Sequence, residues 1–217
     1  MIVFSGLDGA GKSTQIEILK QYFEKKGSKV LVFWSRGGYT DGFELLKTIL
    51  RKVLRKKLPK SGNTPARDKA ISNVKVQKVW LFIAIVDLIF YYSFYLRFQE
   101  KILRKVVICD RYLYDTFIDF RLNFPLQKFE NWVIWKILVK TMYKPSSHFV
   151  ALITVEESVI RSKQKFEPFP DTPEVLAKRL NYYKKYLENN KGIYINGFDS
   201  KSDIKKQIIS YIEKNEN

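Results

Sequence analysis

Gly6-Leu7-Asp8-Gly9-Ala10-Gly11-Lys12-Ser13 carries the strongest structural signal in this chain of 217 residues. The stretch fits the phosphate-binding pattern G-x-x-x-x-G-K-[ST] and directly follows an apolar run, Ile2-Val3-Phe4, that has the character of a strand. Its glycines let consecutive backbone N–H groups converge on phosphate oxygens, and a helix that begins at about Lys12 points its positive end at the same anion. The stretch therefore predicts a site for a nucleoside triphosphate.

The side chains of this loop are expected to bind separate parts of the triphosphate. Lys12 is expected to reach the β- and γ-phosphates, Ser13 to offer its hydroxyl to Mg²⁺, and Thr14 to add a donor at the start of the helix. A glycine turn that matches by chance is the alternative, but it needs the strand, both glycines, the lysine and the hydroxyl to coincide. The predicted nucleotide-binding residues of the loop are Gly6, Asp8, Gly9, Ala10, Gly11, Lys12, Ser13 and Thr14.

Length and composition favour one folded domain in a reducing compartment. The chain is long enough for a single α/β domain, so we assign residues 1–217 to one domain. A hydrophobic content of 46% excludes a disordered chain, and a formal charge of +17 favours anionic partners such as nucleotides, nucleic acid or an anionic membrane. The single cysteine, Cys109, excludes an internal disulfide, and a strand that begins almost at Met1 leaves no room for a signal peptide. We expect a cytoplasmic location.

Apolar, β-branched runs recur along the chain, separated by lengths that hold helices. This alternation predicts an α/β fold with a five-stranded parallel sheet flanked by helices. Helical spacing of apolar residues also predicts helices over Ser13–Lys26 and Phe43–Leu58, and two prolines and a glycine predict a loop over Lys60–Asn73. The predicted strands are Ile2–Phe4, Val30–Trp34, Val106–Cys109, Phe149–Val155 and Ile193–Ile195.

Two segments raise the question of partners other than nucleotides. The basic outer face of Phe43–Leu58 suits phosphate backbones, acidic lipids or simply water, but it lacks the interleaved aromatics of a nucleic-acid groove, so we expect no nucleic-acid partner. Val79–Leu96 is apolar enough and about long enough to cross a bilayer. Asp87 in its middle would cost roughly 2.5–3.5 kcal/mol on insertion scales. We therefore expect no membrane span, but a helix with one face on the sheet and the other on a neighbouring helix or a second subunit.

The third predicted strand ends in a charged pair. Asp110 and Arg111 follow it directly, at the carboxyl edge of the sheet beside the phosphate loop. Asp110 could hold Mg²⁺ through water or orient the attacking oxygen, and the planar guanidinium of Arg111 could clamp a phosphate. A surface ion pair at a strand end is the alternative. The chain has no guanine-reading Asn-Lys-x-Asp segment, so the pattern favours a kinase over a GTPase.

The chain resembles the thymidylate kinase family of P-loop nucleoside monophosphate kinases over nearly its whole length. The family opening, G-[LIV]-D-G-x-G-K-S-T-Q, is matched by residues 6–15, and its D-R-[YHF] by Asp110-Arg111-Tyr112. A looser match is Arg36-Gly37-Gly38-Tyr39-Thr40, which occupies the place of the family's arginine and paired glycine after the second strand. The resemblance implies an ATP- and Mg²⁺-dependent kinase of nucleotide biosynthesis, with dTMP as the leading acceptor, that forms homodimers through its helices.

The resemblance also implies roles for individual residues in acceptor binding. Asp8 is expected near the sugar of the acceptor, Arg36 and Arg111 near its phosphate, with Tyr112 in the same substrate site. Phe82 is the candidate for stacking on the base, although a phenylalanine in so apolar a run also suits the core. We expect Lys12, Asp110 and Arg111 to belong to the catalytic set.

The transition-state cation is expected from a small lid at about residues 156–170. The family takes this arginine either from the phosphate loop or from the lid, and this loop has Gly9 and Ala10 in place of a cation. Arg161 is therefore the expected catalytic arginine, with Lys163 and Lys165 as further lid cations, of which Lys163 is assigned to nucleotide binding. Such an arginine is worth on the order of 10³–10⁵ in rate in related hydrolases. Basic residues on an exposed helix are the alternative.

Two departures from the family pattern leave the acceptor open. Asp87 is followed by Leu88 where the family has an Asp-Arg pair, and Asp115 and Asp119 stand where the family tends to have a serine and then Ala-Tyr-Gln. These changes indicate a divergent thymidylate-kinase-like branch. A kinase for a deoxynucleoside or another small acceptor, and a membrane-associated nucleotide-binding protein without turnover, remain alternatives.

Overall fold

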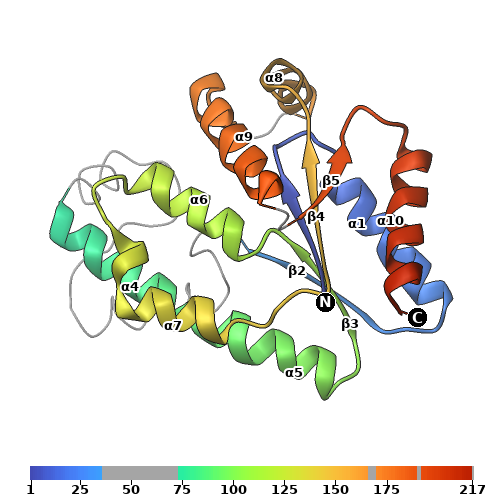
Figure 1. The fold of residues 1–217 in the computed structure, drawn as a ribbon, viewed down its shortest axis with the longest axis horizontal. Coiled ribbons are helices and arrows are strands. Elements are labelled where there is room, and N and C mark those ends of the chain that lie inside the picture. The colour runs from blue at the N-terminus through green and yellow to red at the C-terminus, as the bar shows by residue number, and fades with distance from the viewer. Residues whose placement is uncertain (36–72, 166–169, 190–191, 217) are drawn as a thin grey trace.

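The computed structural model describes residues 1–35, 73–165, 170–189 and 192–216, and shows an α/β fold (Figure 1). Five parallel strands form one sheet in the order β2-β3-β1-β4-β5, which confirms the predicted sheet. Its central strand, β1, leads into the phosphate loop, as in P-loop proteins. The strands are β1 (Ile2–Gly6), β2 (Val30–Trp34), β3 (Val106–Asp110), β4 (Ser147–Leu152) and β5 (Ile193–Asn196).

Strand β4 lies earlier in the sequence than predicted. It begins at Ser147 and ends at Leu152, whereas the apolar run predicted a strand that continues to Val155. Thr154 ends the extended segment because its side chain accepts a hydrogen bond from the backbone N–H of Glu157 and thereby caps the next helix. Val155 is thus the first residue of a helix.

Helices cover both faces of the sheet, and the predicted first helix is confirmed. The predicted helix Phe43–Leu58 and most of the predicted loop Lys60–Asn73 lie outside the described residues. In Figure 1, α1 and α10 lie together on one side of the strands, and α4, α5 and α7 lie on the other. The helices are α1 (Lys12–Lys25), α4 (Val74–Ile89), the π-helix η1 (Phe90–Tyr95), α5 (Leu96–Lys101), α6 (Leu113–Asn123), the 3₁₀ turn η2 (Phe129–Asn131), α7 (Val133–Thr141), α8 (Val155–Gln164), α9 (Pro173–Glu188) and α10 (Lys201–Glu216).

Alternating residues of the strands build two hydrophobic cores. Ile2 and Phe4 of β1 pack into the core with α1, α9 and α10, and Val3 between them packs into the core with α4, α6 and α7. This alternation follows from the two-residue period of a strand. The sheet is therefore buried on both faces, which fixes the carboxyl ends of its strands as the platform for a site.

The segment α4–η1–α5 is one continuous helix, Val74–Lys101, that is long and apolar enough to cross a membrane. Its inner face is buried on the sheet side, as expected, and includes Leu81, Ile85, Leu88 and Tyr92. This burial is typical of a core helix of a globular protein. Such a helix can equal a membrane-spanning helix in length and in apolar composition. Its outer face carries exposed apolar side chains, here called the outer stripe, and they are Val79, Phe82, Val86, Phe90, Phe94 and Phe98.

Candidate active site

The phosphate loop joins β1 to α1 and holds its lysine close to its own backbone. Nζ of Lys12 donates hydrogen bonds to the carbonyl oxygens of Gly6 at 3.0 Å and Leu7 at 2.7 Å. Gly6 has a φ of +131°, and a Cβ there would lie 1.9 Å from the carbonyl oxygen of Ala151 in β4, so only glycine fits. Burial, together with repulsion from Arg111, lowers the pKa of Lys12 to about 8. A buried cation thus lies at the start of α1, where a phosphate is expected.

Helix α8 lies against the phosphate loop through Arg161. Its Nη1 donates to the carbonyl oxygens of Gly9 at 3.1 Å and Gly197 at 3.0 Å, while its Nε donates to Glu157 at 2.6 Å. The hydroxyl of Ser158 donates to the backbone carbonyl of Asp8 at 2.7 Å. Gly9, with a φ of +78°, leaves no room for a Cβ, because that atom would lie 2.8 Å from Cβ of Arg161. The expected lid helix is therefore docked on the loop by two of its side chains.

The end of β3 brings Asp110 and Arg111 to the same edge of the sheet as the loop. Arg111 is buried, and its Nη2 forms an ion pair with Asp8 of the phosphate loop. The charges of Asp8, Asp110 and Asp115 act on Lys12 as well. Burial raises the pKa of Asp110, and Lys12 and Arg111 oppose part of that shift. The structure thus brings Asp8, Lys12, Asp110 and Arg111 into one compact cluster of charges.

The two carboxylates that depart from the family pattern are both paired with arginines. Asp115 is fully buried, with Oδ1 3.6 Å from Nη1 of Arg111. Asp119, one turn later in α6, lies 2.6 Å from Nη1 of Arg179 in α9. Nε of Arg179 lies 2.6 Å from Asp171 as well. Buried arginines therefore balance the negative charges of both carboxylates.

A cavity of about 490 Å³ lies beside the loop, between α8 and the segment that joins β5 to α10. Arg161 and Phe198 lie on one part of its lining, with the guanidinium carbon 5.7 Å from the centre of the ring. The backbone of Gly9 and Gly11 lines another part, so the cavity is continuous with the phosphate loop. Its size and its planar, partly polar lining suit a nucleotide base.

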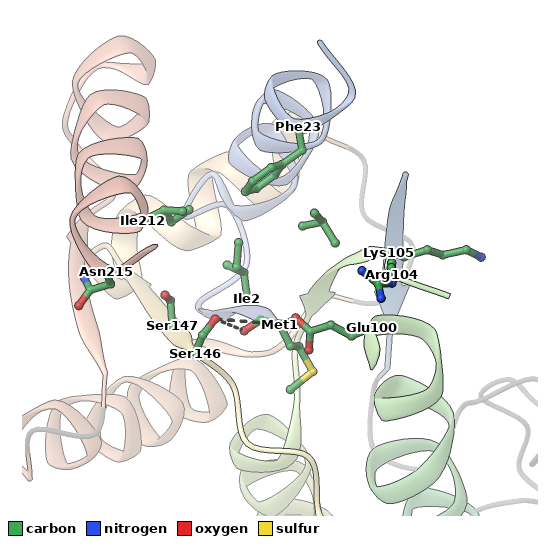
Figure 2. Close-up of a pocket in the computed structure, with 11 residues that line it drawn as sticks. Met1, Ile2, Phe23, Glu100, Arg104, Lys105, Ser146, Ser147, Ile212 and Asn215 are labelled. Carbon is green, nitrogen blue, oxygen red and sulfur yellow. Dashed lines mark hydrogen bonds and ion pairs between the residues drawn. The ribbon is translucent and has the colours of Figure 1, made fainter. Parts of the chain in front are cut away.

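A second cavity, of about 370 Å³, lies at the opposite edge of the sheet (Figure 2). It is lined by the first residues of three strands, Ile2, Val106 and Ser147. The ligands of open α/β sheets bind at the carboxyl ends of the strands, so this cavity is separate from the candidate active site.

The oxygen donors at the carboxyl edge fit a magnesium ion. Ser13 lies exposed in the first turn of α1, and Asp110 ends β3 on the same edge of the sheet. Mg²⁺ takes oxygen ligands and keeps several waters, so one hydroxyl and one carboxylate, with phosphate oxygens, form a typical protein site for it. Within the described ranges, no three His, Cys, Asp or Glu side chains cluster as a separate metal site.

Three other predicted site residues lie apart from this cluster. Tyr112 is buried in the core, where its hydroxyl donates to the carbonyl of Tyr143 at 2.8 Å. Phe82 is exposed and belongs to the outer stripe. Lys163 is exposed on α8 and does not line the cavity beside the loop, whereas Lys165 does. Arg36 lies outside the described residues.

Sequence reasoning missed several residues that support the site. Ser158 and Phe198 have no motif of their own, and they reach the loop only because α8 and the segment after β5 fold against it. Ser5 looked like an ordinary strand residue, yet its hydroxyl donates to Asp115. For Ser5, the sequence offered one signal, a hydroxyl at the end of an apolar strand and directly before the loop.

The fold and the loop define a P-loop protein of the α/β class. No family model matches the chain. Several curated proteins are similar to it. A probable thymidylate kinase of Methanocaldococcus jannaschii is 27% identical over 98% of this chain and 95% of that protein. A probable thymidylate kinase of Thermococcus kodakarensis is 28% identical over 98% and 96%. A thymidylate kinase of Campylobacter hominis is 36% identical over 51% and 44%. The chain is therefore similar to thymidylate kinases over nearly its whole length, and these relatives support a nucleotide kinase.

Proposed function

We propose that the protein transfers the γ-phosphoryl group of ATP to a nucleoside monophosphate, with dTMP as the acceptor. The observation that carries this proposal is the ion pair between Arg111 and Asp8, which joins the end of β3 to the phosphate loop. It places an arginine suited to an acceptor phosphate beside Lys12, which suits the donor phosphates. The names of the relatives favour dTMP over other acceptors.

The residues of the cluster would divide the work between binding and charge neutralisation. Lys12 leaves the carbonyls of Gly6 and Leu7 for the β- and γ-phosphates when ATP binds, while the loop N–H groups hold the phosphate oxygens. Ser13 and Asp110 would hold Mg²⁺, which would supply positive charge to the phosphates of ATP. Arg111 orients the acceptor phosphate, and Asp8 accepts from a sugar hydroxyl. Positioning and electrostatics account for this chemistry without a histidine base.

Arg161 is the proposed transition-state cation, and Lys163 and Lys165 are secondary lid cations. Because Nη1 of Arg161 is bonded to the carbonyls of Gly9 and Gly197, the guanidinium must exchange those partners for phosphoryl oxygens during lid closure. Such closure would also exclude water that could hydrolyse ATP. The cavity beside the loop is the proposed site of the adenine base.

We also infer that two copies of the chain associate through the outer stripe. Phe90 and Phe94 are 58% and 63% exposed, and a row of such side chains is unusual on the surface of a monomer. In a homodimer this stripe would be buried, and the apolar helix would need no membrane. A cytoplasmic location accords with Cys109, a free thiol buried in the core.

Release of ADP from Mg-ATP tests the proposed function. The purified protein is assayed with dTMP, dUMP, other nucleoside monophosphates, thymidine and no acceptor, with Lys12→Ala as the inactive control. Release that depends on dTMP supports the proposal, and dependence on thymidine alone would move the assignment to a deoxynucleoside kinase. Two results would contradict a kinase of this type. One is release of ADP that needs no acceptor, and the other is no release of ADP from a protein that sediments with anionic vesicles.

A further inference from the structure

Arg111 has a backbone conformation that its surroundings must hold in place. Its φ is +72°, in the left-handed region that side chains with a Cβ rarely adopt. Its backbone N–H donates to the carbonyl of Phe4 at 2.8 Å, so the chain turns away from the sheet only after this residue. That turn directs the guanidinium back over the phosphate loop, where it pairs with Asp8.

The carboxylate of Asp115 lies beside this guanidinium and is fully buried. Oδ1 accepts a hydrogen bond from the hydroxyl of Tyr183 at 2.7 Å and lies 3.6 Å from Nη1 of Arg111. Oδ2 accepts from the hydroxyl of Ser5 and from the backbone N–H of Tyr112 at 3.0 Å. Three donors from β1, α9 and the start of α6 therefore fix both oxygens, and Arg111 supplies the compensating positive charge.

A histidine further back fixes the direction of these hydrogen bonds. Burial lowers the pKa of His148 to about 4, so the ring is neutral at ordinary pH. Ser5 gives its single proton to Asp115, so Nε2–H of His148 must donate to Ser5, across 2.7 Å. Nδ1 then accepts from the hydroxyl of Tyr186, at 2.8 Å. The carboxylate is thus held by a directed chain of hydrogen bonds that crosses from α9 through β4 and β1.

The guanidinium of Arg111 retains donors that the protein does not use. Nη1 is buried and donates no hydrogen bond to any described residue, because Asp115 at 3.6 Å is beyond hydrogen-bond distance. A buried donor without a partner is costly unless a ligand completes it. An anionic oxygen of the acceptor's phosphate would do so.

We propose that Asp115 is a positioning residue that holds Arg111 against Asp8, so that Nη1 is free to bind the phosphate of the acceptor. This inference rests on the proposed function. It gives α6 a part in acceptor binding. The residue responsible is a carboxylate in the segment where the family pattern has a serine. Asp115 itself touches no substrate in this role.

The kinetic test compares Asp115→Asn with Asp119→Asn. Both changes remove a buried negative charge from α6, but Asp119 pairs with Arg179 and not with Arg111. Asp115→Asn is expected to lower kcat/KM for dTMP by about 10- to 100-fold, with little change in the Kd for ADP. Asp119→Asn is expected to lower the melting temperature comparably and to leave kcat/KM for dTMP within about threefold of the wild type. Equal kinetic losses in the two variants would overturn the proposal.

A double-mutant cycle with Arg111→Lys separates positioning from a purely structural effect. If Asp115 acts through Arg111, the losses of the two single variants do not add in the double variant. Additive losses would mean that Asp115 acts elsewhere. Asp115→Glu, which keeps the charge, is expected to recover part of the activity.

A spectroscopic readout keeps the test independent of the acceptor. The Nε–H resonance of Arg111, assigned by its loss in Arg111→Lys, is expected to be sharp in the folded wild type and in Asp119→Asn, and to broaden or move in Asp115→Asn. An unchanged resonance in Asp115→Asn would overturn the positioning role. If the wild type phosphorylates no acceptor while the resonance responds as expected, the proposed function fails and the structural role of Asp115 stands.

Discussion

The ammonium group of Lys12 donates a hydrogen bond of 2.7 Å to the carbonyl oxygen of Leu7, inside the loop that it is proposed to serve. Loop carbonyls and carboxylates stabilise its charge there, while burial and Arg111 oppose it. The lysine is therefore held in place and yet is easily deprotonated. Phosphate oxygens would be better partners than carbonyls, so binding of ATP is expected to raise the pKa of Lys12 above its value of about 8.

The affinity for Mg-ATP is accordingly predicted to fall as pH rises through about 8. Below that pH the free protein already carries the charged lysine, whereas above it a proton must be taken up on binding, which costs up to about tenfold in affinity per pH unit. Calorimetry between pH 6.5 and 9.5, in buffers of different ionisation enthalpy, measures both the affinity and the proton uptake. Lys12→Ala should bind weakly, with no such pH dependence. Constant affinity of the wild type up to pH 9.5 would contradict the prediction.

Arg161→Ala is predicted to reduce kcat on the order of 10³-fold while weakening ATP binding by less than about tenfold. The reason is that a transition-state cation contributes mainly when the phosphoryl group is in flight. Lys178→Ala is the control, because Lys178 is an exposed cation on the neighbouring helix α9 and does not line the cavity. Steady-state kinetics and equilibrium binding of ATP give the two quantities. Equal losses in kcat and in ATP affinity would indicate that Arg161 acts by docking α8 on the loop.

Phe90→Glu is predicted to convert a dimer into a monomer. A charge in the centre of the outer stripe would have to be buried on association, and loss of one phenylalanine contact alone costs about 2 kcal/mol. Sedimentation velocity gives the mass of each species. Tyr194→Glu, a change at a half-exposed aromatic of β5, should leave the mass unchanged. A wild type that sediments only as a monomer would eliminate the proposed interface.

His148 is predicted to make folding stability depend on acid pH. Its pKa is lowered from 6.5 to about 4 in the folded protein, so between these values the unfolded chain binds the extra proton and the folded chain does not. The free energy of unfolding should therefore fall by about 3 kcal/mol as pH drops from 6.5 to 4.

Urea denaturation of the wild type and of His148→Gln separates this effect from that of the carboxylates, which titrate in both proteins. The glutamine amide can still donate to Ser5 and accept from Tyr186, so the variant should keep the fold. The difference in stability between the two proteins should shrink as pH falls. A difference independent of pH would mean that the histidine is charged in the folded state.

The sequence predicted the strands and the loop because both depend on local patterns. Ile2–Phe4 and the glycines that follow it form a motif whose backbone is determined within a few residues. Arg111 at the carboxyl edge was predictable for the same reason, since parallel strands place their ends together.

The remaining parts of the site depend on contacts between distant residues. Ser5 and His148 are 143 residues apart, and neither shows from the sequence that the other will share its hydrogen bond. The orientation of Phe82 was also out of reach, because α4 is apolar from Val79 to Ile89 at every position except Asp87, so its pattern shows no contrast between faces. The sequence marked Asp115 and Asp119 as unusual, but it did not show their arginine partners. Those pairings depend on the turn at Arg111 and on the packing of α9 against α6.

The π-helix Phe90–Tyr95 gives the long helix two halves with different phase. Each residue in an α-helix advances by about 100° around the helix axis. A π-helical turn takes up one more residue than an α-helical turn, so the residues after it are rotated by about 100° from their positions in an uninterrupted α-helix. Phe90, Phe94 and Phe98, spaced by four, stay in line because the wider turn absorbs the drift that this spacing would otherwise produce. A regular α-helix over the same residues would turn the far half of the outer stripe away from the near half, and Leu96 away from the core. The wider turn therefore serves both surfaces at once, because it keeps the exposed phenylalanines in one row while it keeps the inner side chains on the core.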